Sequence, residues 1–212
     1  TSLWGAMLHS AIISVPATIL TVYCSTLTAY GLTVYNFKLK NAAHTFIMAI
    51  MMIPAQVSII GFMQFMMKIN LYDSYWPLII PAAASPATYY FMKQYMATGL
   101  SLEIIEAARM DGANEFYIFH RIIFPMAKNG ISSIAIFQFL WTWEDYLWPY
   151  LVINTKEKQL LAVGLKMFNG QYSTDYGALF AATAISIIPV LLIYLFFQKQ
   201  FIAGIAASAV KG

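Results

Sequence analysis

Residues 176–197 read YGALFAATAISIIPVLLIYLFF and contain no charged side chain. A helix of about 20 apolar residues is long enough to span the hydrocarbon core of a membrane, so this stretch predicts a transmembrane helix. Similarly apolar stretches are found at residues 5–32, 44–67, 76–95 and 131–150. We therefore expect an all-α integral membrane protein, with five membrane-spanning helices in a single domain over residues 1–212.

The composition of the chain also favours a membrane protein. Of 212 residues, 60% are hydrophobic and 10% are charged, whereas soluble domains carry about 25% charged residues. The net charge of +3 comes from 12 basic and 9 acidic residues, which are too dispersed to indicate a nucleic-acid-binding patch. The single cysteine, Cys24, excludes a disulfide framework within the chain.

Prolines interrupt several of the apolar stretches, which predicts kinked helices packed in a bundle; they are Pro16, Pro54, Pro81, Pro86 and Pro189. The basic residues near the spans predict the orientation, because the richer side faces the cytoplasm. The richer side holds Lys38, Lys40, Lys93, Arg109, Arg121, Lys128, Lys199 and Lys211, and the other side holds Lys68, Lys156, Lys158 and Lys166. The C-terminus is then cytoplasmic and Thr1 lies outside, which predicts at least one further helix upstream.

The segment between the third and fourth expected spans, residues 101–125, reads SLEIIEAARMDGANEFYIFHRIIFP. We expect two short helices around a turn, because Gly112 can take the left-handed conformation that ends a helix. Ser101 and Asn114 are expected to cap these helices by accepting hydrogen bonds from backbone N–H groups. Pro125 is expected to end the second helix. Such a charged and partly apolar helix pair at a membrane surface predicts a protein partner.

The order of residues in this segment resembles the EAA loop of binding-protein-dependent ABC importer permeases. The matching residues are Glu106, Ala107, Ala108, Asp111, Gly112, Phe119, Ile122 and Pro125. The expanded form is similar to the carbohydrate-uptake branch of the family, in particular to the second subunit of maltose-type permeases. The segments 143–149 (WEDYLWP) and 209–212 (AVKG) are similar to late segments of the same proteins.

This resemblance implies a six-helix permease domain whose EAA loop, the coupling loop about 101–125, docks on a cytoplasmic ATPase. The matching residues would then be coupling residues, with Glu106 pairing a basic residue of the ATPase. The implied partners are a second permease in a heterodimer, two ATPase subunits and an extracellular solute-binding protein. The implied function is ATP-driven carbohydrate import across a prokaryotic inner membrane. The chain itself would be no enzyme, and it would bind no cofactor because ATP and Mg²⁺ would be held by the ATPases.

Two acids and two tryptophans lie within the fourth expected span, at Trp141, Trp143, Glu144 and Asp145. Acidic side chains at membrane depth are costly and usually face a cavity or a partner, so these residues are candidates for the lining of a sugar path. The alternative is an interfacial aromatic belt near the outer boundary. The residues alone leave both interpretations open.

The polar segment about 151–175 is expected to be an outer loop, with a turn at Asn169-Gly170. The resemblance implies that this loop reaches the binding protein, and a plain connection is the alternative. By the same resemblance the tail 203–212 would contact the ATPases, against the alternative of a frayed end.

Other functions are less consistent with the sequence. No metal site is expected, because His9, His44 and His120 are far apart in the chain, and there is no phosphate-binding loop for ATP. A membrane-embedded enzyme would need a catalytic constellation that we do not find. An ion-coupled secondary transporter remains the alternative function, although it should carry more ionisable residues in its spans than Glu144 and Asp145.

Overall fold

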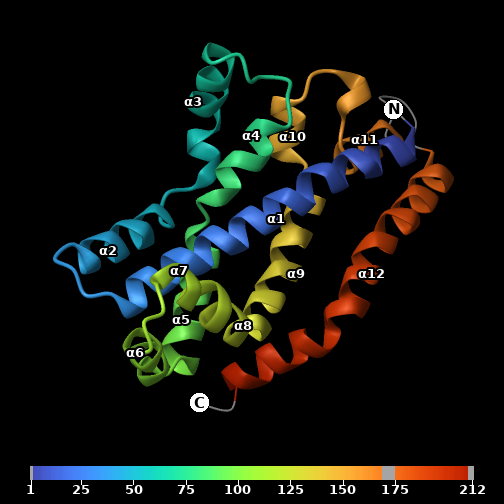
Figure 1. Ribbon diagram of the computed structural model, residues 1–212. Helices are drawn as coiled ribbons and strands as arrows, with labels where there is room; N and C mark the ends of the chain where they lie inside the picture. The colour runs from blue at the N-terminus through green and yellow to red at the C-terminus, as the bar shows by residue number, and fades with distance from the viewer. Residues whose placement is uncertain (1, 169–174, 210–212) are drawn as a thin grey trace. The chain divides into compact units, whose positions relative to one another are not determined.

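The computed structural model describes residues 2–168 and 175–209, with the backbone alone at 167 and 200–209, and this part of the chain is helical without a β-strand (Figure 1). The longer helices are α1 (Leu3–Val34), α2 (Lys40–Ile50), α3 (Ala55–Lys68), α5 (Pro86–Gly99), α6 (Leu102–Met110), α9 (Lys128–Glu144) and α12 (Tyr176–Ala209). The shorter elements are α4 (Trp76–Ile79), η1 (Ile80–Ala83), α7 (Glu115–Tyr117), η2 (Ile118–Ile123), α8 (Phe124–Met126), α10 (Leu147–Val152), η3 (Lys156–Lys158), α11 (Leu161–Leu165) and η4 (Lys166–Phe168). The expected all-α fold is thus confirmed for the described residues.

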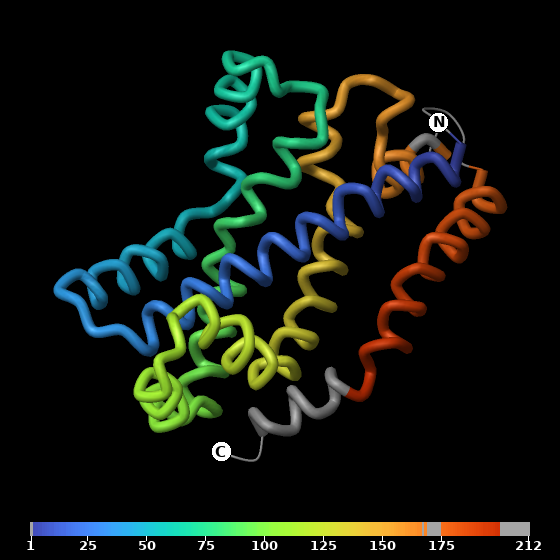
Figure 2. Tube along the Cα trace, viewed as in Figure 1, coloured from blue at the N-terminus to red at the C-terminus, as the bar shows by residue number. Residues whose placement is uncertain are grey.

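The chain divides into two compact units. Unit 1 comprises residues 1–20, 54–82 and 136–196, and unit 2 comprises residues 21–53, 83–135 and 197–212. Three of the longer helices, α1, α9 and α12, contribute one part to each unit. Within unit 1, α10 packs against α3 and α4, and within unit 2, α2 packs against α5 (Figures 1 and 2).

The prolines act in two different ways. Pro16 and Pro189 lie inside α1 and α12, which remain continuous helices. Pro54 instead precedes α3, Pro81 lies in the 3₁₀ turn η1, and Pro86 is at the start of α5. A proline in the first turn costs nothing because the N–H that it lacks has no helical partner there. The expected spans 44–67 and 76–95 are therefore each divided between shorter helices, and 131–150 is divided between α9 and α10.

Two of the described helices, Leu3–Val34 and Tyr176–Lys199, are long and apolar enough to cross a membrane. The number rises to four if the interrupted pairs α2 with α3, and Glu115–Met126 with α9, each count as one span; residues 76–95 are not among the four. In the most apolar 18-residue stretch of α12, only 6% of the residues are buried within the chain, against 39% in the corresponding stretch of α1. The apolar surface of α12 therefore needs lipid or another protein chain to cover it.

The core of unit 2 is built around the segment that carries the expected coupling loop. Phe119 and Ile123 are buried there with Tyr30 of α1 and with Met92 and Met96 of α5. In the same unit a Cβ atom at Gly130 would lie 2.7 Å from Cγ of Tyr95. Glycine thus permits the close approach of the first turn of α9 to α5.

Unit 1 is packed along the N-terminal part of α1, which presents small buried residues. Ser10 is fully buried, and its Oγ accepts a hydrogen bond of 2.9 Å from the backbone N–H of Leu161. Gly164 of α11 approaches Ala6, where its missing Cβ would lie 3.6 Å from the alanine side chain. Small residues at such contacts let helical segments pack closely.

Candidate functional site

The expected coupling loop folds as two helical segments joined by a tight turn (Figure 2). Gly112 has a φ of 82°, and its N–H donates a 3.0 Å hydrogen bond to the carbonyl of Arg109. The Asn114 side chain accepts a 2.8 Å hydrogen bond from the N–H of Tyr117. The turn at Gly112 and the cap at Asn114 are therefore confirmed. The cap expected at Ser101 is wrong, because its side chain accepts no hydrogen bond from the helix.

An ion pair closes this turn. Nε of Arg109, near the end of α6, lies 2.7 Å from Oε1 of Glu115, at the start of α7. The other carboxylate oxygen, Oε2, accepts hydrogen bonds from Tyr30, at 2.9 Å, and from Tyr35. The Arg109 guanidinium lowers the pKa of Glu115 to about 2, and the two tyrosine hydroxyls add to this effect. Sequence reasoning missed this cluster, although the placement of Arg109 and Glu115 on either side of a glycine turn was a usable signal.

The second helical segment is less regular than expected. Residues 118–123 form a π-helical turn, and the helix continues through Pro125 to Met126. The prediction that Pro125 ends the helix is wrong, because Pro125 lies in the first turn of α8, where its missing N–H is tolerated. His120 Nδ1 lies 2.8 Å from the carbonyl of Phe116, and Nε2 lies 3.1 Å from the Tyr23 hydroxyl. A carbonyl only accepts hydrogen bonds, so the ring donates from Nδ1 to Phe116.

One face of α6 is exposed. Ile105 is buried, whereas Glu106 and Ala107 are exposed and Ala108 is half-buried. Within the described residues, the carboxylate of Glu106 forms no hydrogen bond or ion pair. Met110, one turn further along α6, is 87% exposed, and Phe116 of α7 is 72% exposed. Asp111 is exposed, Ile122 is half-buried and Phe119 belongs to the core.

The four residues considered for a substrate path have different environments in unit 1. Trp143 is only 5% exposed; its ring stacks on Phe139 at 5.4 Å and its N–H donates to the carbonyl of Ser186 at 3.3 Å. These contacts make Trp143 part of the packing of α9 against α12. Glu144 is exposed at the end of α9. Trp141, which is 56% exposed, and Asp145 line one cavity.

This cavity has a volume of about 250 Å³. Its lining residues are Ile13, Pro77, Leu78, Pro81, Ala82, Gln138, Trp141, Thr142, Asp145, Trp148, Pro149 and Leu160. Gln138 and Thr142 are hydrogen-bonded to each other at 3.3 Å, through the amide Nε2 and the hydroxyl. The cavity therefore combines two indoles with an amide, a hydroxyl and a carboxylate.

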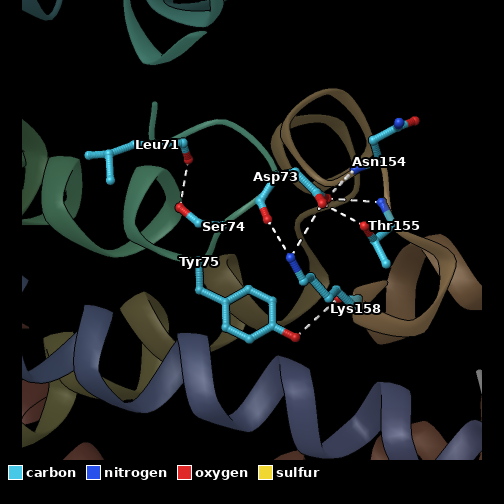
Figure 3. Close-up of polar contacts among 7 residues, drawn as sticks. All are labelled: Leu71, Asp73, Ser74, Tyr75, Asn154, Thr155 and Lys158. Atoms are coloured by element: carbon cyan, nitrogen blue, oxygen red, sulfur yellow. Dashed lines mark hydrogen bonds and ion pairs between the residues drawn. The ribbon is translucent and has the colours of Figure 1, made fainter. Parts of the chain in front are cut away.

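Asp73 joins two loops of unit 1 (Figure 3). Its Oδ1 accepts hydrogen bonds from the N–H groups of Asn154, at 2.8 Å, and Thr155, at 2.9 Å. Its Oδ2 accepts a bond of 2.5 Å from the Thr155 hydroxyl and lies 3.3 Å from Nζ of Lys158. The residue has a φ of 57°, a conformation that aspartate tolerates better than most residues. The start of the expected outer loop is thus fixed to the segment before α4, which the sequence alone did not indicate.

We expect Asp73→Asn to loosen this contact at neutral pH but not in strong acid. The bonds from Thr155 lower the pKa of Asp73 from 3.8 to about 2. Because the folded pKa is depressed, the stabilisation of about 2 kcal/mol is present above about pH 4 and is lost as the pH falls towards 2. Amide exchange at Asn154 and Thr155, corrected for intrinsic rates, should be faster in the variant at pH 7 and equal to wild type near pH 2. Equal protection at pH 7 would contradict this role of the carboxylate.

Some candidate residues cannot be placed. Asn169 and Gly170 lie outside the described residues, as does the end of the tail from residue 210. Within residues 2–168 and 175–209, no group of three or more His, Cys, Asp or Glu side chains is arranged to hold a metal ion. His44 is instead 2.9 Å from the hydroxyl of Tyr89, measured from Nδ1.

Known proteins resemble this chain over most of its length. It is 37% identical over 204 residues to the arabinooligosaccharides transport system permease protein AraQ of Bacillus subtilis, covering 96% of this chain and 72% of that protein. It is 29% identical over 207 residues to the sn-glycerol-3-phosphate transport system permease protein UgpE of Escherichia coli, covering 97% and 73% of the two chains. A crystal structure of a bacterial ABC transporter that imports the acidic polysaccharide alginate matches with a TM-score of 0.82 and 25% identity, over 95% of this chain and 76% of that one.

The family described as binding-protein-dependent transport system inner membrane component matches residues 7–206. This match covers most of both units, including residues 101–125 and the residues that line the cavity. The fold, the apolar helices and the relatives agree on a multi-pass membrane transport subunit with the fold of an ABC importer permease. The chain therefore belongs to the family of inner membrane components of binding-protein-dependent transport systems.

Proposed function

We propose that this chain is a membrane-spanning subunit of an ATP-driven carbohydrate importer. The name of its relative AraQ specifies arabino-oligosaccharides as the cargo of that system. The proposed complex contains a second permease, two cytoplasmic ATPase subunits and an extracellular binding protein. ATP and Mg²⁺ would be bound by the ATPases, and this chain would contribute the path and the mechanical coupling.

The exposed face of α6 is the observation that carries the coupling proposal. It presents the unpartnered carboxylate of Glu106 and, one helical turn further on, the exposed side chain of Met110. A carboxylate next to exposed apolar surface is suited to a protein interface, because a basic side chain of the partner would offset the free-energy cost of removing the carboxylate from water. In this proposal Glu106, Ala107 and Ala108 contact an ATPase.

The anchoring of α6 explains how a movement of the ATPases could reach the membrane helices. Ile105 is buried in the core of unit 2, and Arg109 is bonded to Glu115, which is bonded in turn to Tyr30 of α1. Gly112 sets the turn between the two helical segments, and Phe119 fixes the second one in the core. A push on α6 would therefore move α1 and the loop together, without any chemical step in this chain.

The topology that we propose has the coupling loop and the C-terminus in the cytoplasm of a prokaryotic cell, and residues 151–175 outside. Five segments would cross the membrane, three of them broken, as the interrupted helices permit when neighbouring helices satisfy the freed backbone groups. The binding protein would contact the outer loop, for which Asn169 and Gly170 remain candidates. The hydrogen bonds of Asp73 with Asn154 and Thr155 support the proposed topology, because they hold the start of this loop against the segment before α4.

The function can be tested by transport with the assembled complex. We expect cells or proteoliposomes that contain the complex to take up arabinotriose only while ATP is supplied. Depletion of ATP with the ion gradients intact should reduce the initial uptake rate to background. Uptake that survives ATP depletion, and stops when an ion gradient is collapsed, would instead favour an ion-coupled secondary transporter.

A further inference from the structure

The cavity of unit 1 contains polar groups whose bonding is incomplete. One oxygen of Asp145, Oδ1, accepts hydrogen bonds from the N–H groups of Leu147, at 3.1 Å, and Trp148, at 3.4 Å. Within the described residues, Oδ2 has no partner, and neither has the indole N–H of Trp141 or of Trp148. One acceptor and two donors therefore remain for a ligand, which is the small set of polar groups that orients a molecule in an otherwise apolar site.

The two indoles add flat apolar surface to these polar groups. Trp148 is held in place by an edge-to-face contact with Phe62, with ring centroids 5.2 Å apart. Trp141 is more open and lies beside Phe137 at 6.4 Å. A sugar ring has an apolar face of C–H groups and a rim of hydroxyls that both donate and accept. An indole surface next to a carboxylate and an amide is complementary to both parts of such a ring.

The charge of the lining distinguishes between classes of cargo. Asp145 is the one ionisable residue in the lining, and no lysine, arginine or histidine is present there. A phosphate or a uronic acid would lose its hydration without gaining a cation, and it would meet the negative field of Asp145. The cargoes named for the relatives include the anions sn-glycerol 3-phosphate and alginate as well as arabino-oligosaccharides. Only the neutral class fits this lining.

We propose that this cavity binds one ring of a neutral sugar, with Trp141 and Trp148 against the ring and Asp145 Oδ2 accepting a hydroxyl hydrogen bond. Gln138 and Thr142 face the same ligand. This assignment rests on the proposed function, because it makes the cavity a subsite of the carbohydrate path in this subunit. It leaves Trp143 and Glu144 outside the subsite.

The direct test measures sugar binding to the purified importer in nanodiscs, without the binding protein, by saturation-transfer NMR. The neutral probes are arabinotriose and maltotriose, and the anionic probe is sn-glycerol 3-phosphate. We expect a neutral probe to bind and the anionic probe to give no signal. Asp145→Asn and Trp141→Ala should each weaken the binding about 10-fold, as expected for the loss of one strong hydrogen bond or one stacking surface.

Matched variants separate the subsite from general damage. Asparagine at 145 can still accept the N–H groups of Leu147 and Trp148, so Asp145→Asn removes the charge and retains the turn. Glu144→Gln makes the same change at the neighbouring residue, which does not line the cavity, and Trp4→Ala removes an exposed indole of the same unit. Both controls should bind like wild type. If Trp141→Ala fails to assemble with the other subunits, the binding of the neutral probes to Asp145→Asn alone tests the subsite.

The inference is overturned if neither neutral probe binds, if sn-glycerol 3-phosphate binds as well as they do, or if the Asp145 and Trp141 variants bind like wild type. ATP-dependent sugar uptake by the wild-type importer is measured in parallel. If that uptake is present and any of these results is obtained, only the subsite is rejected. If ATP-dependent sugar uptake is absent, the proposed function is rejected as well.

Discussion

Replacement of Glu106 by lysine should abolish ATP-driven uptake, reducing its initial rate by at least about 100-fold. The carboxylate is exposed on α6 and has no partner among the described residues, so its removal costs the isolated chain little. In the proposed complex it would be desolvated against a basic residue, and breaking such a pair costs about 3–5 kcal/mol. Reversing its charge adds repulsion to that loss. Uptake and co-purification of the ATPases measure the two consequences.

The matched control is Glu103→Lys, which makes the same charge change earlier on α6. Glu103 is also exposed, and its replacement by lysine exchanges a favourable contact with the helix N-terminus, worth about 0.3–1 kcal/mol, for an unfavourable one of similar size. Uptake should then fall by less than about 5-fold. If Glu106→Lys retains wild-type uptake and a full complement of ATPases, α6 does not dock through Glu106.

Gly112→Pro should be almost as damaging, because it destroys the turn itself. Gly112 has a φ of 82°, whereas proline is held near −65°. Proline also lacks the N–H that donates to Arg109. The two helical segments would separate, and Arg109 and Glu115 would no longer meet. We expect loss of bound ATPases and of uptake, measured on the complex in detergent and in proteoliposomes.

Gly112→Asn is the control for this change. Asparagine adopts positive φ more readily than most residues, and nothing lies within 4 Å of a Cβ atom added at Gly112. The asparagine variant should therefore retain most of the uptake while the proline variant loses it. Equal activity of the two variants would show that the turn geometry has no part in coupling.

The sequence predicted which segments are helical better than it predicted where they break. Hydrophobic composition located both ends of α1 and the start of α12 within a few residues, because a long apolar helix needs no tertiary information to be recognised. It did not predict the end of α12, which continues beyond residue 197 to Ala209. Proline composition could not distinguish Pro16 and Pro189, which lie within continuous helices, from Pro54, which lies between two. That difference depends on which neighbouring groups compensate the missing hydrogen bond, and this is a property of the packed fold.

The candidate site divides in the same way. Gly112 and Asn114 act on their own turn, so local rules were sufficient to predict them. The hydrogen bonds that Tyr30 and Tyr35 donate to Glu115 join residues distant in sequence, and no periodicity indicates them. Trp141 and Trp143 are nearly adjacent in the sequence, yet one lines a cavity and the other is buried in packing. Composition could not separate them because both are tryptophans on the same apolar helix.

The hydrogen bonds of Glu115 to Tyr30 and Tyr35 have a consequence for hybrid permeases. A hybrid in which only residues 101–125 are exchanged for those of another transporter would replace Glu115 and keep Tyr30 and Tyr35. The two hydroxyls would then have either a different acidic partner or none. In the proposed complex the hybrid would keep its contact with the ATPase, but the loop would lose its hydrogen bond to Tyr30 of α1. If the loop couples as proposed, a working hybrid would have to include both tyrosines, so the residues to be exchanged would not form one continuous stretch of the sequence.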